Sequence, residues 1–123
     1  MFKALISLGV IFSLIFLANT SPLSKTDWTI IKVRNNGGYV ARFEIRYRLN
    51  QEYFQESTGT FAVGQSRSIL IPPEARSIVV KCENNIFISS WSTIFSYNME
   101  IAKETCFEVA GTTLNPRWST VDC

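Results

Sequence analysis

The side chains that could do chemistry in this chain of 123 residues are three cysteines and a few carboxylates, because the sequence contains no histidine. Without histidine, Ser-His-Asp and Cys-His catalysis are excluded and the commonest zinc ligand is missing. Cys82, Cys106 and Cys123 are too scattered for a Cys-x-x-Cys metal or redox unit. Glu104 and Glu108 share one face of an expected strand, but they lie about 13 Å apart, too far for a glycosidase pair. We therefore expect no enzyme, no bound metal and no cofactor.

The cysteines favour a disulfide instead. If the chain turns back at residues 114–115, Cys106 and Cys123 are equidistant from the apex and meet across the base of the hairpin. Cys82 falls in phase with the apolar residues before it, which suggests a buried thiol. We therefore favour a disulfide between Cys106 and Cys123, with Cys82–Cys106 as the rival pairing. The odd count leaves one thiol that is unpaired or joins two copies in a homodimer.

The first 20 residues have the pattern of a secretory signal peptide. A short positive start precedes an apolar run over residues 4–18, and a small-residue cleavage site ends at Thr20. The run is shorter than the roughly 20 apolar residues that span a bilayer. We therefore expect a secreted, extracellular protein made of residues 21–123, which is long enough for one domain and in which disulfides are permitted.

The charge balance of the expected mature chain is close to neutral. Eleven basic and ten acidic residues remain after residues 1–20 are removed, which leaves a net charge of +1. Such a balance gives no electrostatic case for binding nucleic acid or for strong attraction to anionic lipids. Arg42, Arg46 and Arg48 alternate with Glu44 on one face of an expected strand, and we interpret them as solvated strand charges rather than a phosphate or glycan site.

The periodicity of the sequence predicts an all-β fold. Residues 39–48 alternate between apolar and polar side chains, a period typical of a half-buried antiparallel strand. Turn signals separate the other short strands, among them Asn-Asn-Gly-Gly at residues 35–38, which predicts a hairpin, and Asn-Asn at residues 84–85. No helical stripe or repeat is present. The pattern predicts a single antiparallel β-sandwich.

One turn in residues 106–116 carries an unusual residue. A strand ends at Gly111, and a polar tip that closes with Asn115 and Pro116 follows it, with the apolar Leu114 near its apex. The residues alone leave two alternatives open. Leu114 packs back under the loop, as is common for single apolar surface residues, or it is offered to a partner outside the protein.

Three segments, in the same order, resemble the C-terminal β-sandwich domain of the cholesterol-dependent (thiol-activated) cytolysins. Residues 38–43, Gly-Tyr-Val-Ala-Arg-Phe, are similar to the family's Gly-Ala-Tyr-Val-Ala-x-Phe. Residues 69–71 with the proline after them, followed by residues 75–78, form the second segment. Residues 111–116, Gly-Thr-Thr-Leu-Asn-Pro, are similar to Gly-Thr-Thr-Leu-Tyr-Pro and are the most specific element. The resemblance covers residues 36–116.

This resemblance implies a position at a membrane and a ligand. In the family this domain touches the bilayer with its tip loops, and the Thr-Leu pair that recognises sterol corresponds to Thr113 and Leu114. The family's tryptophan-rich undecapeptide should fall near residues 82–91, where this chain is shorter and keeps only Trp91. The pore-forming domains are absent, so we expect no pore from this protein by itself.

The leading hypothesis is a secreted membrane- or sterol-binding module with a role as a toxin or in defence. Burial of one leucine contributes roughly 1.5–3 kcal/mol, whereas even an affinity of 1 mM needs about 4.1 kcal/mol. We therefore predict a binding site made of several residues: Thr112, Thr113, Leu114, Phe87 and Trp91. The alternatives are a secreted module that binds a glycan or a protein receptor on the same sandwich without lipid activity, and a purely structural secreted protein.

Overall fold

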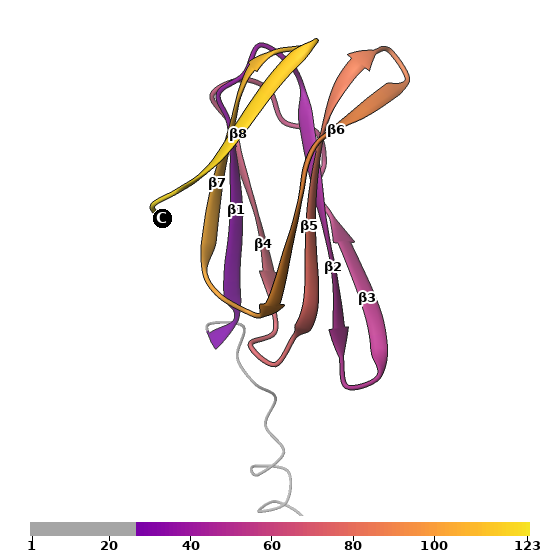
Figure 1. Ribbon diagram of the computed structural model, residues 1–123, viewed down its shortest axis with the longest axis vertical. Coiled ribbons are helices and arrows are strands. Elements are labelled where there is room, and N and C mark those ends of the chain that lie inside the picture. Colours follow the sequence, from indigo (N-terminus) through magenta and orange to yellow (C-terminus); the bar gives the residue numbers. More distant parts are fainter. Residues whose placement is uncertain (1–26) are drawn as a thin grey trace, which may run out of the picture.

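The computed structural model describes residues 27–123 as a sandwich of two four-stranded β-sheets (Figure 1). The strand order is β4-β1-β7-β8 in one sheet and β3-β2-β5-β6 in the other. The predicted all-β sandwich is thereby confirmed, whereas the predicted signal peptide lies outside the described residues. Within these residues, no helix is long and apolar enough to cross a membrane. The strands are β1 (Thr29–Asn35), β2 (Ala41–Leu49), β3 (Glu52–Ser57), β4 (Ser66–Ile71), β5 (Arg76–Phe87), β6 (Ser90–Ile101), β7 (Thr105–Thr112) and β8 (Asn115–Val121).

The core lies between the inner faces of the two sheets. In β2 the odd-numbered residues from Ala41 to Tyr47 are buried and the arginines alternate with them, as the period of two predicts. Branched and aromatic side chains fill the space because they pack well on pleated surfaces. The fully buried members with large side chains include Ile31, Val33, Phe43, Ile45, Phe61, Ile71, Ile78, Val80, Phe107 and Val109.

The connection from β1 to β2 crosses from one sheet to the other, so the hairpin predicted at residues 35–38 is wrong. β1 pairs antiparallel with β4 and parallel with β7, the one parallel pairing among the described strands. Asn35 is buried, and its Nδ2 donates to the carbonyl oxygens of Tyr39 at 2.7 Å and Phe61 at 3.1 Å. Its Oδ1 accepts from the backbone N–H of Gly37 at 2.9 Å. The asparagine therefore organises a crossing loop rather than a two-residue turn.

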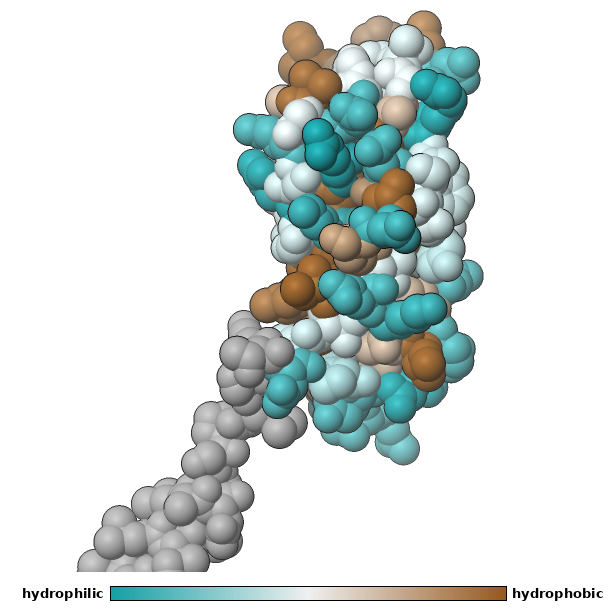
Figure 2. Space-filling view, turned by 90° about the vertical axis from the view of Figure 1, so that its left-hand side faces the viewer, coloured by the Kyte–Doolittle hydropathy of each residue, from teal (hydrophilic) through white to brown (hydrophobic). Residues whose placement is uncertain are grey.

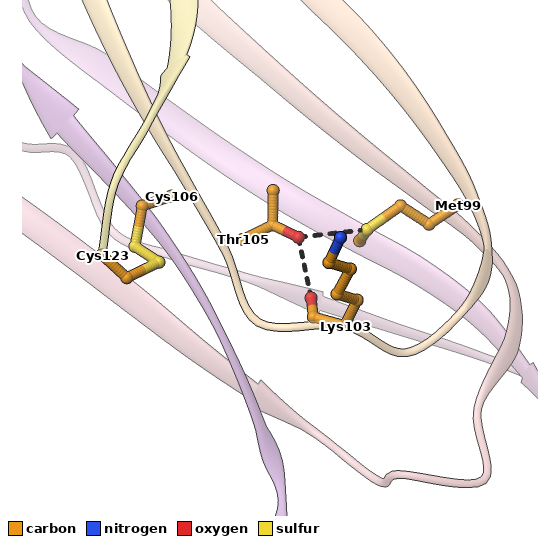
Figure 3. Close-up of a disulfide and its surroundings, with 5 residues drawn as sticks. All are labelled: Met99, Lys103, Thr105, Cys106 and Cys123. Atoms are coloured by element: carbon orange, nitrogen blue, oxygen red, sulfur yellow. Dashed lines mark hydrogen bonds between the residues drawn. A yellow bond between two sulfur atoms is a disulfide. The ribbon is translucent and has the colours of Figure 1, made fainter.

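A disulfide joins Cys106, near the start of β7, to Cys123 (Figure 3). Their Cα atoms are 5.3 Å apart. This is the pairing predicted from the hairpin, although β7 and β8 pair Cys106 with Val121, so the apex lies one residue earlier than expected. Beside the bond, the Thr105 hydroxyl lies 2.7 Å from the carbonyl oxygen of Lys103 and stabilises the turn that leads into β7.

We predict that peptide mapping without reduction recovers a fragment in which Cys106 is joined to Cys123. Replacement of both by serine should lower the free energy of unfolding by on the order of 3 kcal/mol, because the bond closes a loop with a sequence separation of 17 residues. Urea unfolding of the two proteins measures this difference. Recovery of a fragment joining Cys82 to Cys106 would contradict the pairing.

Candidate functional site

Two hairpin tips lie at the same end of the sandwich, the upper end in Figure 1. In the β7–β8 hairpin Thr112 pairs with Asn115, so the turn consists of Thr113 and Leu114. The β5–β6 hairpin turns between Phe87 and Ser90. The turn predicted at residues 84–85 is therefore wrong, because β5 continues through both asparagines.

Four large apolar side chains are exposed at this end and form what we call the apolar rim. Leu114 is 85% exposed, Phe87 70%, Val63 60%, and Ile88 is fully exposed. Val63 belongs to the connection between β3 and β4, which is bonded to the upper end of β1 through the backbones of residues 35, 64 and 65. Figure 2 shows apolar side chains at the upper end of the face in view, and others further down the same face. Leu114 is thus offered outward, as the ligand-facing alternative requires.

The β7–β8 hairpin is held in place by hydrogen bonds from the β1–β2 loop. The backbone N–H groups of Asn36 and Gly38 donate to the carbonyl oxygens of Val109 at 2.7 Å and Gly111 at 3.0 Å. The Tyr39 hydroxyl donates to the carbonyl oxygen of Ala110 at 2.6 Å. These bonds pair carbonyl groups on the edge of β7 that faces away from β8. The tip is therefore fixed relative to the core, and does not hang as a free loop.

Asn84 links the tip to the second sheet. Its side chain lies in β5 with no exposed surface, and its Nδ2 donates to the carbonyl oxygen of Thr113 at 2.9 Å. The Thr113 hydroxyl lies 3.4 Å from the carbonyl oxygen of Gly38, so Thr113 contacts both β5 and the β1–β2 loop. Thr112 is exposed. The Oδ1 atom of Asn84 is buried and has no hydrogen-bond partner. The contact joins the β5–β6 and β7–β8 hairpins into one unit.

Trp91 does not belong to the apolar rim. It pairs with Asn85 across the β5–β6 hairpin and is half-buried. The guanidinium of Arg42 lies 4.0 Å from the centre of its ring, a cation–π contact, and Arg42 Nε is 3.2 Å from a carboxylate oxygen of Glu83. This stack fixes the ring on the side of the sandwich. Among the predicted site residues, the structure thus brings Thr112, Thr113, Leu114 and Phe87 to one end and leaves Trp91 beside it.

The sequence interpretation missed Val63 and Ile88. A turn at residues 84–85, as the sequence predicts, leaves Ile88 three residues beyond it and gives no reason to expect it at the tip. Ile88 is the first of the two turn residues 88–89, whereas Leu114 is the second of the two turn residues 113–114 in the other hairpin, so each turn carries one apolar residue at its apex. Val63 carries no local signal beyond the glycine after it.

The buried side chains next to the site are not poised for chemistry. Burial raises the pKa of the Cys82 thiol to about 12. The pKa of Tyr39 is also raised to about 12, mainly by burial and to a smaller extent by the nearby Cys82. Cys82 is free and enclosed by the core, so its thiol is not exposed at the surface. No group of three or more acidic or thiol side chains in residues 27–123 is arranged to hold a metal ion. This end of the molecule offers contact area rather than reactive groups.

We predict that Gly111→Ala destabilises the protein by more than about 1 kcal/mol. Gly111 has a φ of +88°, and an added Cβ would clash with the backbone oxygen of Asn115. Gly59→Ala is the matched control, because a Cβ there meets no atom within 4 Å. Urea unfolding of both variants measures the difference, and equal stability of the two would contradict the strained turn.

We also predict that the protein loses stability between pH 9 and pH 12. The thiol of Cys82 ionises near 9.0 in an unfolded chain but only near 12 when buried, so unfolding releases a proton in this interval. Tyr39 acts in the same direction above pH 10. Unfolding curves at pH 8 and pH 11 measure the loss, which Cys82→Ala should reduce.

Alkylation of Cys82 by iodoacetamide at pH 8 should require denaturant, and equal rates with and without urea would contradict its burial.

Comparison with known proteins gives a family match and a set of similar folds. The family model described as the thiol-activated cytolysin beta sandwich domain matches residues 30–117. Listeriolysin O has 23% identity over 78% of this chain and 23% of that chain, with a TM-score of 0.58. Suilysin from Streptococcus suis has 19% identity over the same shares, with a TM-score of 0.59. The membrane-binding domain of pneumolysin has 15% identity over 78% of this chain and 97% of that chain, with a TM-score of 0.59.

At these identities the solved structures show a shared fold. The chain spans about a quarter of the length of listeriolysin O and suilysin, and nearly all of the separate pneumolysin domain. No curated protein sequence matches the chain. The match therefore concerns one domain of much longer proteins.

Proposed function

The chain belongs to the family of thiol-activated cytolysin beta sandwich domains, and from this premise we propose that it is a membrane-binding module that recognises sterol-containing bilayers. The observation that carries the proposal is the exposure of Leu114 on a turn fixed to both sheets. Because hydrogen bonds hold the backbone of the turn in place, little further backbone ordering is needed when the apolar side chain on it enters an apolar phase. The related pneumolysin domain, which carries the name membrane-binding domain, supports the same proposal.

The apolar rim supplies enough contact for membrane binding. Burial of its four side chains, Val63, Phe87, Ile88 and Leu114, contributes about 6–12 kcal/mol before the costs of association, at roughly 1.5–3 kcal/mol each. Leu114 alone stays below the value needed for an affinity of 1 mM. The chain thus binds through several tips at once, with Leu114 as the central contact.

The two threonines of the tip provide the polar part of the proposed sterol contact. Thr112 is exposed beside the turn, and the long contact of Thr113 with Gly38 leaves its hydroxyl able to exchange partners. A sterol carries one hydroxyl and a rigid apolar body, so a threonine next to a leucine offers it one polar and one apolar contact. Trp91, stacked on Arg42, contacts the membrane from the side of the sandwich and does not insert.

We propose that the protein acts outside the cell as a binding module. A disulfide within the described fold and the signal pattern of residues 1–20 both support secretion. We propose no catalysis, since the site offers contact area alone, and no pore formation by this chain itself. Its role as a toxin or in defence follows from the same family premise.

We predict that the protein floats with phosphatidylcholine vesicles that contain cholesterol and far less with vesicles that lack it. Thr113→Ala with Leu114→Ala should abolish the sterol-dependent part, and Leu114→Ser with Ile88→Ser should abolish flotation altogether. Ile101→Ser is the matched control, because Ile101 is 59% exposed but lies at the C-terminal end of β6, away from the tips. Vesicle flotation followed by quantification of bound protein measures each effect.

Three results would oppose the proposal. If the tip variants float as well as Ile101→Ser, the apolar rim is not the surface that contacts the membrane. Equal flotation with and without cholesterol would remove the sterol. Negligible flotation in both mixtures would favour the alternative, a secreted module that binds a glycan or protein receptor, and a glycan array would then identify the ligand class.

A further inference from the structure

A basic surface lies at the opposite end of the sandwich from the apolar rim. Strands β2 and β5 place Arg48 directly opposite Arg76, and Arg46 precedes Arg48 by two residues along β2. We call these three residues the basic patch. Like charges opposite each other on neighbouring strands destabilise a sheet, so this arrangement is unfavourable for the sandwich by itself.

No carboxylate of the described residues forms an ion pair with an arginine of the basic patch. Glu83 pairs with Arg42 and Lys81, the two ion pairs found in residues 27–123. Glu44, which separates the arginines along β2, accepts a hydrogen bond from Gln55 at 2.7 Å. The arginines of β2 alternate with Glu44 on the solvent side of the strand, as the sequence predicts, but of these arginines only Arg42 forms an ion pair within residues 27–123.

The backbone beside the basic patch is irregular and leaves a hollow. Ser77 has a φ of +50°, which is uncommon for a residue with a side chain, and the pairing of β5 with β2 shifts there. Such conformations gather at binding sites, where the surrounding structure holds them. A hollow of about 450 Å³ opens at this point, lined by Ser77, Val79, Asn98 and Glu100 among others. Val79 is the cross-strand neighbour of Arg46, so the hollow borders the patch.

An exposed aromatic ring completes the surface. Tyr53 pairs with Arg48 across β2 and β3, and it is 68% exposed. Guanidinium groups bind sulfate and carboxylate in a bidentate manner, and an aromatic face packs against the apolar face of a sugar ring. We propose that the basic patch and Tyr53 bind a sulfated glycan.

The placement of the patch favours a glycan over a lipid or a nucleic acid. Strand β5 runs from Arg76 to Phe87, about 36 Å at 3.3 Å per residue. Charges at that distance from a bilayer touched by the tips are screened, because the Debye length is about 8 Å in physiological salt. Three cations without an ion-pair partner in residues 27–123 gather here, too few for the extended contacts that nucleic acid binding uses. The glycan site is distinct from the rim, and its assignment to a glycan in place of a lipid rests on the proposed contact of the tips with the bilayer.

The test is calorimetric titration of the full disulfide-bonded chain with a heparin-derived hexasaccharide at several salt concentrations. Arg46→Gln with Arg48→Gln and Arg76→Gln should weaken binding at least tenfold and lower the salt slope by about 2–3, since each released counterion contributes roughly 0.7–0.9. The matched control carries Lys32→Gln, Arg34→Gln and Arg117→Gln, three exposed cations of the other sheet, and should change binding less than twofold. Unchanged circular dichroism confirms that the variants are folded.

Two further variants separate a built site from simple charge attraction. Tyr53→Ala should weaken binding several-fold without a change in the salt slope, because it removes a sugar contact and no charge. Glu100→Gln should strengthen binding, because Glu100 is the carboxylate among the residues that line the hollow.

The proposal is overturned if the two triple variants lose affinity equally, because net charge alone would then explain binding. It is equally overturned if the hexasaccharide does not bind in physiological salt. A patch variant that loses flotation with phosphatidylserine vesicles and keeps glycan affinity would assign the surface to lipid instead. Flotation with neutral, cholesterol-containing vesicles should be the same for the patch variant and the parent protein, so failure here is distinguishable from failure of the apolar rim.

Discussion

The hydrogen bonds between the β1–β2 loop and the β7–β8 hairpin are the constraint on which the rest of the structure depends. Buried backbone groups must be paired, and here the crossing loop pairs with the hairpin through Gly38 and Tyr39. The parallel pairing of β1 with β7 brings the loop to that position. As a consequence, the turn that carries Leu114 has a fixed place at the end of the sandwich. Its backbone loses conformational entropy when the protein folds, and little more is lost when it binds.

The same constraint explains the division of the molecule into two surfaces. Because the tips are fixed to the core at one end, the basic patch on β2 and β5 lies at a fixed distance from the tips and from any surface that the tips contact. Apolar side chains dominate the first surface, and the second carries three arginines that form no ion pair within residues 27–123. A rigid sandwich with dissimilar ends can contact two partners of different chemistry without any change of shape.

Local patterns allowed part of this structure to be predicted from the sequence. The alternation of residues 39–48 predicted β2, and the symmetry about the tip predicted the bond of Cys106 with Cys123. Asn35 and Asn84 could not be interpreted in this way, because a buried asparagine and a turn asparagine look alike in sequence. Their partners, Phe61 and Thr113, lie 26 and 29 residues away, and only the tertiary structure reveals them. Because residues 84–85 have the composition of a turn, the sequence also offers no indication that Ile88 lies at the true turn and belongs to the apolar rim.

The central claim, that the tip enters the bilayer, is tested most directly by fluorescence quenching at single positions. Leu114→Trp and Ile101→Trp each add an indole at an exposed site, one at the tip and one away from it. With vesicles that contain cholesterol and brominated phosphatidylcholine, we predict that the added fluorescence of Leu114→Trp is strongly quenched and that of Ile101→Trp is not. Equal quenching at both positions, or none at Leu114→Trp while the protein is bound, would contradict the account.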